Sequence, residues 1–448
     1  EKIGQNLSSF INLFLIGSLR KYRSIKSSNV AYCLSNYQQS GGIKYLYFDD
    51  FNNNFWVRKP MKILALGGSG GMGRFAVNSL INHEKIKKIY VADLNASSAK
   101  NFASNFDNRV EGLELDITNN EALINEMSKV DIVVNTTGPF FKFGIPVLKA
   151  AIETNTHYFD ICDDWEPTEK MLLMNNQEKS SEITGIIGLG ASPGLTNILA
   201  YLAISELDEV SKVYTGWNIS GAKPEDKSSQ KGVNAAMVHG IEQVTGHVKV
   251  FNNGKFEMVR PLKEVIVNYP EIGEKKANIF GHPEAISFPY HYPNIKESLN
   301  LMHGGEKGLV GILKFIRLLI EIKLISKNMA ARIFTWLDNS ISSEIKKTNT
   351  IDLPSVYGYA EGKKGDKNFS VGVTFDDSIQ NLSMGEATSL PLACGVKMFL
   401  DGVISQRGIH APESGIIDPK IFLEYLAKEI GNGIELSPLI TMNEGNDF

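Results

Sequence analysis

A glycine-rich stretch, LALGGSGGMGRFA at Leu64 to Ala76, carries the first residues of this chain whose types and spacing could do chemistry. The glycines match G-x-G-x-x-G at Gly68, Gly70 and Gly73, and they also match G-x-x-G-x-x-G from Gly67. Glycines let the backbone approach a pyrophosphate closely, and the N–H groups at the start of a following helix stabilise that anion. The stretch therefore predicts a phosphate-binding turn made of Gly68, Ser69, Gly70, Gly71, Met72 and Gly73.

A carboxylate stands where a dinucleotide site needs one. Asp93 lies near the end of KIYVADLN, twenty residues after Gly73, where a carboxylate accepts hydrogen bonds from both ribose hydroxyls of NAD. No arginine follows Asp93 directly to clamp the 2′-phosphate of NADP, although Arg74 could reach a phosphate from the helix. The sequence favours NAD as the cofactor and leaves NADP possible.

Two further loops supply candidate cofactor contacts. The segment VEGLELDIT leads to Asp116 and Ile117, which we expect beside the adenine. The segment VDIVVNTTG leads into a loop that contains Thr136, Thr137, Gly138 and Pro139. Both loops follow strand-like segments, and an open α/β sheet binds its ligand at the carboxyl ends of strands, near the point where the strand order reverses.

Two pairs of side chains are candidates for the proton chemistry that hydride transfer to an imine requires. Asp163 and Asp164 follow THYFDIC and could hold a substrate ammonium or tune a proton donor, and a solvated loop is the alternative. His282 and Glu284 form an adjacent acid–base pair in GHPEAISFP, for which ordinary surface polarity is the alternative. We expect Cys162 to pack beneath the acidic loop rather than act as a nucleophile, and no cysteine spacing indicates a metal site.

Alternating strands and helices must position these groups, and the first half of the chain shows that alternation. The runs KILAL, KIYVADLN, VEGLE and VDIVV are of strand type, whereas RFAVNSLIN, NEALINEM and IPVLKAAIETN have helical spacing, the last with Pro146 in its first turn. Alternation of this kind predicts an α/β fold with a doubly wound parallel sheet of the Rossmann type.

Beyond residue 190, strand-like segments follow one another directly and predict a second, α+β domain with a mixed or antiparallel sheet. HVKVFNNGKFEMV predicts a hairpin with Asn253 and Gly254 in a type I′ turn, and SVYGYAEG with NFSVGVTFDD predicts a second antiparallel pair. The helical segment GLVGILKFIRLLIEIKLI cannot span a membrane, because four charged residues interrupt it. It favours a core or dimer helix over a helix on a membrane surface.

Six segments, in order, resemble the saccharopine dehydrogenase family: GGSGGMGR, ADLN, VDIVVNTTGPFFKFGIPVLKAAIETNTHYFDICDDWEP, GASPGLTN, GHPEAISFP and RGIHAPESGIIDP. The resemblance covers nearly everything from Met61 to about residue 430. It implies a Rossmann domain at 61–190, an inserted α+β substrate and dimerisation domain at 191–385, and a segment at 386–448 that returns to the Rossmann domain. It also implies hydride transfer between a nicotinamide cofactor and a C–N bond of an amino-acid or polyamine adduct.

The chain departs from the family pattern at two places. Family members that act on saccharopine resemble LDPG where this chain has Ala191, Ser192, Pro193 and Gly194, and a tyrosine often follows the loop proline where this chain has Phe140. These departures count against saccharopine itself as the substrate. Because a binding fold alone does not prove chemistry, a non-catalytic nucleotide-binding or lipid-surface protein that keeps the fold stays open as the alternative.

The composition narrows the choice of partner. With 46 Lys plus Arg against 50 Asp plus Glu, the 448 residues carry a net charge of −4, which leaves no basic field for a nucleic acid. We therefore expect a small-molecule substrate, and we expect a homodimer. The three cysteines are too scattered for a disulfide framework, which fits the cytoplasm. Residues 1–60 show no sustained period, and we expect them to be a poorly ordered extension before a functional chain that starts at Met61.

Overall fold

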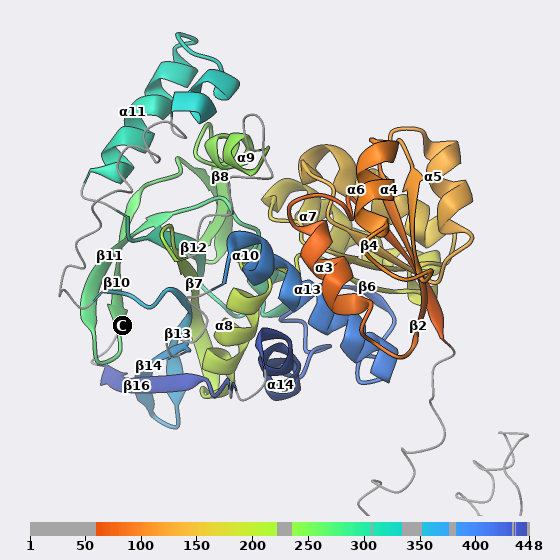
Figure 1. Ribbon diagram of the computed structural model, residues 1–448. Helices are drawn as coiled ribbons and strands as arrows, with labels where there is room; N and C mark the ends of the chain where they lie inside the picture. Colours follow the sequence, from red (N-terminus) through yellow and green to blue (C-terminus); the bar gives the residue numbers. More distant parts are fainter. Residues whose placement is uncertain are drawn as a thin grey trace, which may run out of the picture. The chain divides into compact units, whose positions relative to one another are not determined.

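Two β-sheets organise the part of the chain that the structure describes (Figure 1). This computed structural model describes residues 60–221, 235–305, 308–333, 352–375, 382–431, 434 and 436–445. The expected N-terminal extension lies outside the described residues, except for Pro60.

The first sheet has seven strands, and every neighbouring pair in it is parallel. Its order is β15-β6-β5-β4-β1-β2-β3. The strands are β1 (Met61–Leu66), β2 (Ile86–Asp93), β3 (Val110–Glu114), β4 (Ile132–Asn135), β5 (His157–Asp160), β6 (Thr184–Ile186) and β15 (Gly408–His410). Because β1 lies between β2 and β4, the strand order reverses at β1, as in a doubly wound sheet. The predicted Rossmann-type sheet is confirmed.

Helices accompany this sheet because its central strands are apolar along their length. All four residues of β4 and the last four of β1 are buried, which is typical of a parallel sheet covered on both faces. The helices are α3 (Gly73–Leu80), α4 (Ala96–Ala103), α5 (Asn120–Met127), α6 (Phe140–Glu153), α7 (Trp165–Leu173), α13 (Met384–Asp401) and α14 (Pro419–Ile430).

Helix α6 begins earlier than the sequence predicts. It starts at Phe140, so Pro146 lies inside the helix, and its predicted place in the first turn is wrong. A distant group stabilises the earlier start, because Oδ2 of Asp164 accepts the backbone N–H of Phe141 at 3.0 Å. A carboxylate at this end also interacts favourably with the helix dipole.

The second sheet has nine strands and is mixed, as predicted. Its order is β10-β11-β12-β7-β13-β14-β16, and β8 pairs with β12 and β9. The strands are β7 (Glu209–Asn218), β8 (Val248–Asn252), β9 (Lys255–Val259), β10 (Glu264–Tyr269), β11 (Gly273–Ile279), β12 (Glu297–His303), β13 (Val356–Lys364), β14 (Lys367–Thr374) and β16 (Leu439–Gly445). Both predicted hairpins are confirmed, and Asn253 and Gly254 have the positive φ values, 51° and 73°, of a type I′ turn.

Helix α8 (Leu195–Ser205) joins the two sheets. It follows β6 of the first sheet and packs on β7, β13 and β14 of the second. The other helices beside the second sheet are α9 (Ala235–Gln243), α10 (Glu284–His291) and α11 (Leu309–Glu321). The loop between β6 and α8 therefore lies where residues of both sheets can meet.

The last part of the chain contacts both sheets. Helix α13 packs on α3, and the Ser389 hydroxyl donates to the Met72 carbonyl at 2.7 Å. Strand β15 extends the first sheet beside β6, whereas β16 pairs with β14 of the second. The domain boundaries at residues 190 and 385 remain a prediction.

Candidate functional site

The turn between β1 and α3 closes through contacts that only glycine permits. Gly67 has a φ of 69°, a left-handed conformation that side chains rarely adopt. A Cβ on Gly73 would lie 2.2 Å from the Gly67 carbonyl oxygen and 2.6 Å from the Gly68 Cα. At Gly70 the nearest atom to a Cβ would be the Gly67 oxygen, at 3.1 Å. Gly67 and Gly73 therefore close the turn, whereas Gly70 leaves more space beside it.

The start of α3 is suited to an anion. Met72, at the N-cap, provides no side-chain acceptor for the first N–H groups, and the first turn contains no acidic residue. Asp93 stands beside the turn, because its Oδ2 accepts the Ser69 hydroxyl at 2.5 Å and its Oδ1 accepts the N–H of Asn95 at 3.0 Å. A pyrophosphate would supply the negative charge that the helix start lacks.

Asp116 and Ile117 follow β3, as predicted, but each is engaged with the protein. Oδ1 of Asp116 accepts the N–H and the hydroxyl of Thr118 at 2.9 and 2.6 Å, and these hydrogen bonds lower the pKa of Asp116. Ile117 is partly buried against the core. Contact of either residue with an adenine remains a prediction.

The loop after β4 contains a buried hydroxyl that lacks a partner. The Thr136 hydroxyl donates to the Leu66 carbonyl at 2.9 Å and so ties β4 to β1. The Thr137 hydroxyl oxygen is buried and has no hydrogen-bond partner among the described residues. A Cβ on Gly138 would meet nothing within 4 Å, and Pro139 is the N-cap of α6. Thr137 and Gly138 thus suit a bound group, whereas Thr136 and Pro139 serve the fold.

Asp160, at the end of β5, links the loops that follow β4, β5 and β6. Its Oδ1 accepts the N–H groups of Gly188 and Cys162 at 2.7 and 3.0 Å. Its Oδ2 accepts the hydroxyl of Tyr158 at 2.7 Å, and that hydroxyl accepts the Asn135 amide at 3.1 Å. Burial raises the pKa of Asp160 to about 6. Burial also raises the pKa of the Cys162 thiol, which fits its expected packing role.

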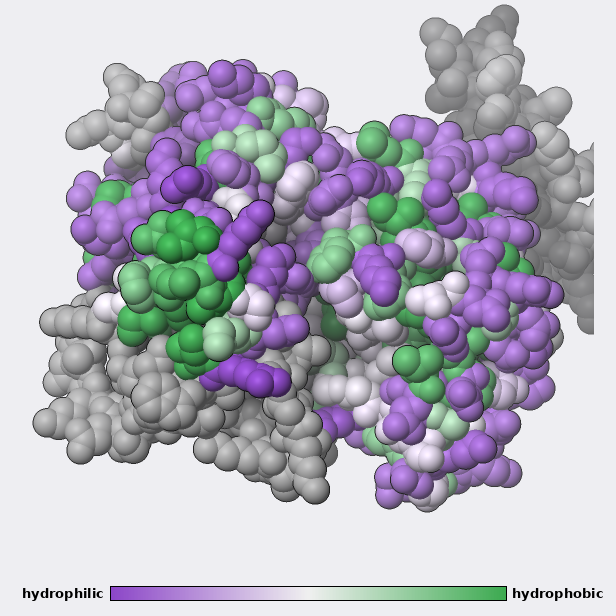
Figure 2. Space-filling view, turned by 90° about the horizontal axis from the view of Figure 1, so that it is seen from above, coloured by the Kyte–Doolittle hydropathy of each residue, from purple (hydrophilic) through white to green (hydrophobic). Residues whose placement is uncertain are grey.

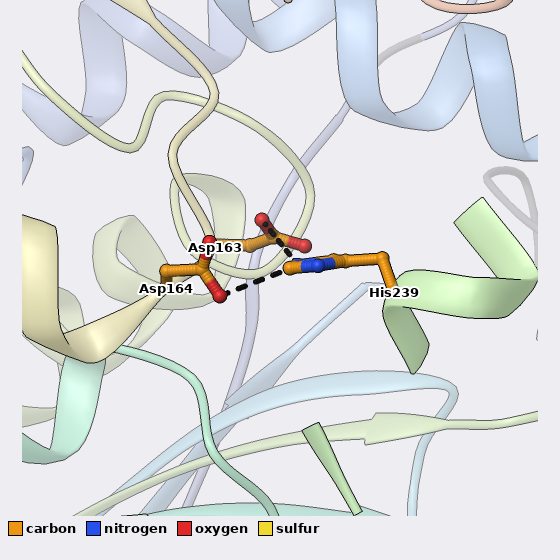
Figure 3. Close-up of side chains that lie close together, drawn as sticks. All are labelled: Asp163, Asp164 and His239. Carbon is orange, nitrogen blue, oxygen red and sulfur yellow. Dashed lines mark hydrogen bonds and ion pairs between the residues drawn. The ribbon is translucent and has the colours of Figure 1, made fainter. Parts of the chain in front are cut away.

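Asp163 and Asp164 lie in the loop after β5 and meet a histidine that the sequence analysis missed (Figure 3). Nε2 of His239, on α9, lies 3.2 Å from Oδ1 of Asp163 and 3.4 Å from Oδ1 of Asp164. The side chains of His239, Asp163 and Asp164 are 17%, 29% and 13% exposed. The alternative of a merely solvated loop is wrong for these two carboxylates. No motif surrounds His239, and only the tertiary fold brings it to the acidic loop.

The charged groups in this cluster shift one another's pKa values. Burial lowers the pKa of His239, but the charges of Asp163 and Asp164 and the hydrogen bond to Asp163 outweigh burial and raise it to about 9. Burial and the neighbouring charge of Asp163 raise the pKa of Asp164 to about 6. Burial alone would raise the pKa of Asp163, yet the charge of His239 holds it below its usual value. At neutral pH the cluster therefore holds an imidazolium between two carboxyl groups.

His282 and Glu284 are buried, so the alternative of surface polarity is wrong for them. The Ser192 hydroxyl donates to Oε1 of Glu284 at 2.6 Å and lies 3.0 Å from Nδ1 of His282. Thr196 and Asn300 also donate to Oε1 of Glu284, at 2.8 and 3.0 Å. Burial raises the pKa of Glu284 to about 7 and lowers that of His282 to about 4. The network fixes the loop after β6 to α8, α10 and β12.

Comparison with known proteins shows which family the first sheet resembles. Residues 63–186 match a family model described as the saccharopine dehydrogenase NADP binding domain. The solved structure of apo histidine-tagged saccharopine dehydrogenase (L-Glu forming) from Saccharomyces cerevisiae is 16% identical and superposes with a TM-score of 0.56, covering 85% of this chain and 100% of that one. Residues 63–186 are thus similar to the nucleotide-binding domain of the saccharopine dehydrogenase family, and the solved structure shares the fold.

Two curated relatives match this chain over different lengths. It is 25% identical over 166 residues to the saccharopine dehydrogenase-like oxidoreductase of Rattus norvegicus, covering 33% of this chain and 37% of that protein. The match thus spans about a third of the rat protein. It is 21% identical over 341 residues to carboxynorspermidine synthase of Vibrio alginolyticus, covering 69% of this chain and 78% of that protein.

The residues present fit a nicotinamide dinucleotide, the class of cofactor that the description of the matched domain names. The glycine turn, the N-terminus of α3 without an acidic residue and the unpaired Thr137 hydroxyl lie at or beside the switch point of the sheet. The ligand atoms of Asp163, Asp164 and His239 all lie within 4.8 Å of one another and could also hold a divalent cation, although the sequence analysis predicts no metal. Which of these residues contact a bound group remains a prediction.

Gly70 and Gly73 should respond differently to an added methyl group. Gly73→Ala forces a Cβ against backbone atoms, so we expect a loss of about 1–3 kcal/mol of stability and a melting temperature several degrees lower. Gly70→Ala should melt close to the native chain but weaken NADH binding at least tenfold, measured by cofactor fluorescence. Gly311→Ala, where a Cβ meets nothing within 4 Å, is the stability control. Native-like NADH affinity in Gly70→Ala would contradict this assignment.

Glu284 should make stability depend on pH. Its folded pKa, about 7, exceeds its ordinary value of 4.5, so its contribution is fully present below pH 4.5 and is lost as the pH rises through 7. Glu284→Gln keeps an acceptor oxygen and removes this loss, which is on the order of 3 kcal/mol at pH 8. We expect the variant to melt several degrees above the native chain at pH 8. Glu264→Gln, at an exposed site, serves as the control. The same dependence of melting temperature on pH in all three proteins would contradict this prediction.

Proposed function

We propose that this chain is a nicotinamide-dependent oxidoreductase that transfers a hydride at a C–N bond of an amino-acid or polyamine adduct. The observation that carries the proposal is the meeting of two features at one edge of the first sheet. The glycine turn follows β1, and the acidic cluster and the Ser192 network follow β5 and β6. The polyamine in the name of the Vibrio relative supports the same class of substrate.

The loops at the carboxyl edge of the first sheet would have different roles. A bound nicotinamide cofactor would supply or receive the hydride. The turn at Gly68–Gly73 would hold its pyrophosphate, and Asp93 its adenosine ribose. Asp163 and Asp164 would attract a substrate amine, since both lie at the carboxyl end of β5. The buried Ser192 network would keep the loop after β6 in place.

We place the protein in the cytoplasm as a homodimer that acts on a small molecule and binds no nucleic acid. These four statements extend the expectations drawn from charge, cysteine content and family resemblance. Among the described residues, no helix combines the length and the apolar character needed to cross a bilayer.

Cofactor titration and turnover test the proposal together. We expect NADH to bind more tightly than NADPH, because Asp93 would face the added 2′-phosphate with like charge. Asp93→Asn should narrow that difference. NADH should then be oxidised in the presence of an α-keto acid and a primary amine, followed by loss of absorbance. Tighter binding of NADPH would overturn the cofactor choice, and cofactor binding without turnover of any such pair would favour the non-catalytic alternative.

A second candidate function is attachment to a lipid surface, and α11 favours it. Leu313 and Ile316 anchor the helix, while the segment exposes other large apolar side chains by 50% or more: Phe315, Leu318, Ile322, Leu324 and Met329. Figure 2 shows hydrophobic side chains gathered on one face of the part of the molecule that contains α11. Lys314, Lys323 and Lys327 accompany them and suit anionic headgroups.

Vesicle flotation separates this role from a dimer helix. We expect the native chain to float with phosphatidylcholine vesicles that contain phosphatidylserine, and the double variant Phe315→Glu with Leu324→Glu to stay in solution. Ile266→Glu, an equally polar change at an exposed site of β10, is the matched control. A native chain that does not float, but whose dimerisation is lost in the double variant, would assign the same face to a second copy.

A further inference from the structure

His239 is fixed over the carboxyl end of β5 although it comes from a remote part of the chain. Its Nε2 lies between Asp163 and Asp164, and Nε2 of Gln243, one turn along α9, donates to the Asp163 carbonyl at 3.1 Å. Nearby, Lys249 of β8 pairs with Glu169 of α7 at 2.5 Å. Three contacts between the same two regions therefore hold the imidazole in one place.

That place faces the half of the sheet where a nicotinamide is expected. The turn after β1 suits the pyrophosphate, and β2 and β3 lie on one side of β1, with Asp93 ending β2. Strands β4, β5 and β6 lie on the other side and would receive the nicotinamide. Asp164 also accepts the N–H of Phe141, two residues after Pro139, so the cluster touches the loop after β4 as well.

Access favours His239 over the other titratable groups near this edge. His282 and Glu284 are 7% and 1% exposed, and Nδ1 of His282 and Oε1 of Glu284 are engaged by the Ser192 hydroxyl. Asp160 is fully buried and joins the loops after β5 and β6. His239 keeps 17% of its side chain exposed, and the two carboxylates at its Nε2 are themselves 29% and 13% exposed, so the cluster lies nearer to solvent than the Ser192 network.

The charges around the imidazole are mainly negative. Asp163 and Asp164 face Nε2, and Oε2 of Glu242, on the same helix, lies 3.9 Å from Nδ1. Lys327 partly offsets Glu242, from which it lies 3.1 Å away, and His282 is the nearby neutral group. An environment of this sign stabilises an imidazolium and attracts an amine.

We propose that Nε2 of His239 exchanges a proton with the substrate nitrogen, which takes the place of one of the two carboxylates at Nε2 while the other positions the ring; this rests on the proposed function. In the reductive direction a hydride from the reduced cofactor forms a C–H bond at the imine carbon. The π pair of the C=N bond moves to nitrogen and forms an N–H bond with the proton that leaves Nε2. The neutral imidazole then takes a proton from solvent, and the reverse direction uses the neutral imidazole as base.

The test compares His239→Gln with the exposed His247→Gln as matched control. We expect His239→Gln to lower kcat for the NADH-dependent reaction about 10²–10⁴-fold, to lose the alkaline limb of the kcat pH profile, and to bind NADH within twofold of the native chain. Exogenous imidazole should partly restore kcat in His239→Ala. An unchanged kcat and pH limb in His239→Gln, with NADH-dependent turnover intact, would overturn the role of His239 alone.

A second readout does not need turnover. The imidazole C–H resonance of His239 should titrate near pH 9 in the native chain and at lower pH in Asp163→Asn. One equivalent of zinc or manganese bound by the native chain and lost in His239→Gln would overturn the proposal, because the metal would occupy Nε2. A native chain that binds NADH but reduces no keto acid and amine pair would overturn the proposed reaction and this inference together.

Discussion

The carboxyl group of Asp160 is the constraint on which the candidate site depends. A carboxylate with no solvent exposure costs free energy unless hydrogen bonds replace water, and Asp160 accepts three of them. The donors are Tyr158 of β5, Cys162 after β5 and Gly188 after β6, and the Tyr158 hydroxyl in turn accepts the amide of Asn135 at the end of β4. The loops that carry Thr137, the acidic cluster and Ser192 all leave the sheet within a few residues of these bonds. Their side chains can meet because this one group fixes the positions where the loops begin.

The site contains two sets of titratable groups with different environments. Glu284 and His282 are buried, and burial moves both toward their neutral forms. His239 and Asp163 remain partly exposed and stabilise each other as ions. A buried network of neutral groups is suited to holding a loop, whereas a charged and partly exposed pair is suited to attracting an amine and moving a proton. The division of roles between the two sets follows from this contrast.

Local sequence patterns predict most of the helices and strands, but they predict much less of the candidate site. The alternation after Met61 and the Asn253–Gly254 turn predict strands, helices and a hairpin correctly, because burial and φ preference act over a few residues. The predicted start of α6 is wrong, because the group that stabilises the observed start, Asp164, lies far along the chain. His239 was missed for the same reason: its partners are 76 and 75 residues away, and no local spacing records them.

The family resemblance predicts the fold better than it predicts the site residues. Residues 63–186 match the nucleotide-binding model, and the second sheet follows the mixed architecture that the resemblance implies. Ser192 stands at a point where the chain departs from the family pattern, and it is the residue that joins His282 to Glu284. This departure from the motif therefore falls at a residue that fixes the loop after β6 in this chain.

A crystal structure with bound NADH tests the central claim most directly. We expect the pyrophosphate at the turn of Gly68–Gly73, the adenosine ribose at Asp93, and the nicotinamide over the ends of β4 and β5 with C4 facing the side of His239. A cofactor bound in the opposite direction, with the nicotinamide over β2 and β3, would contradict the account. So would a nicotinamide separated from His239 by the Ser192 network.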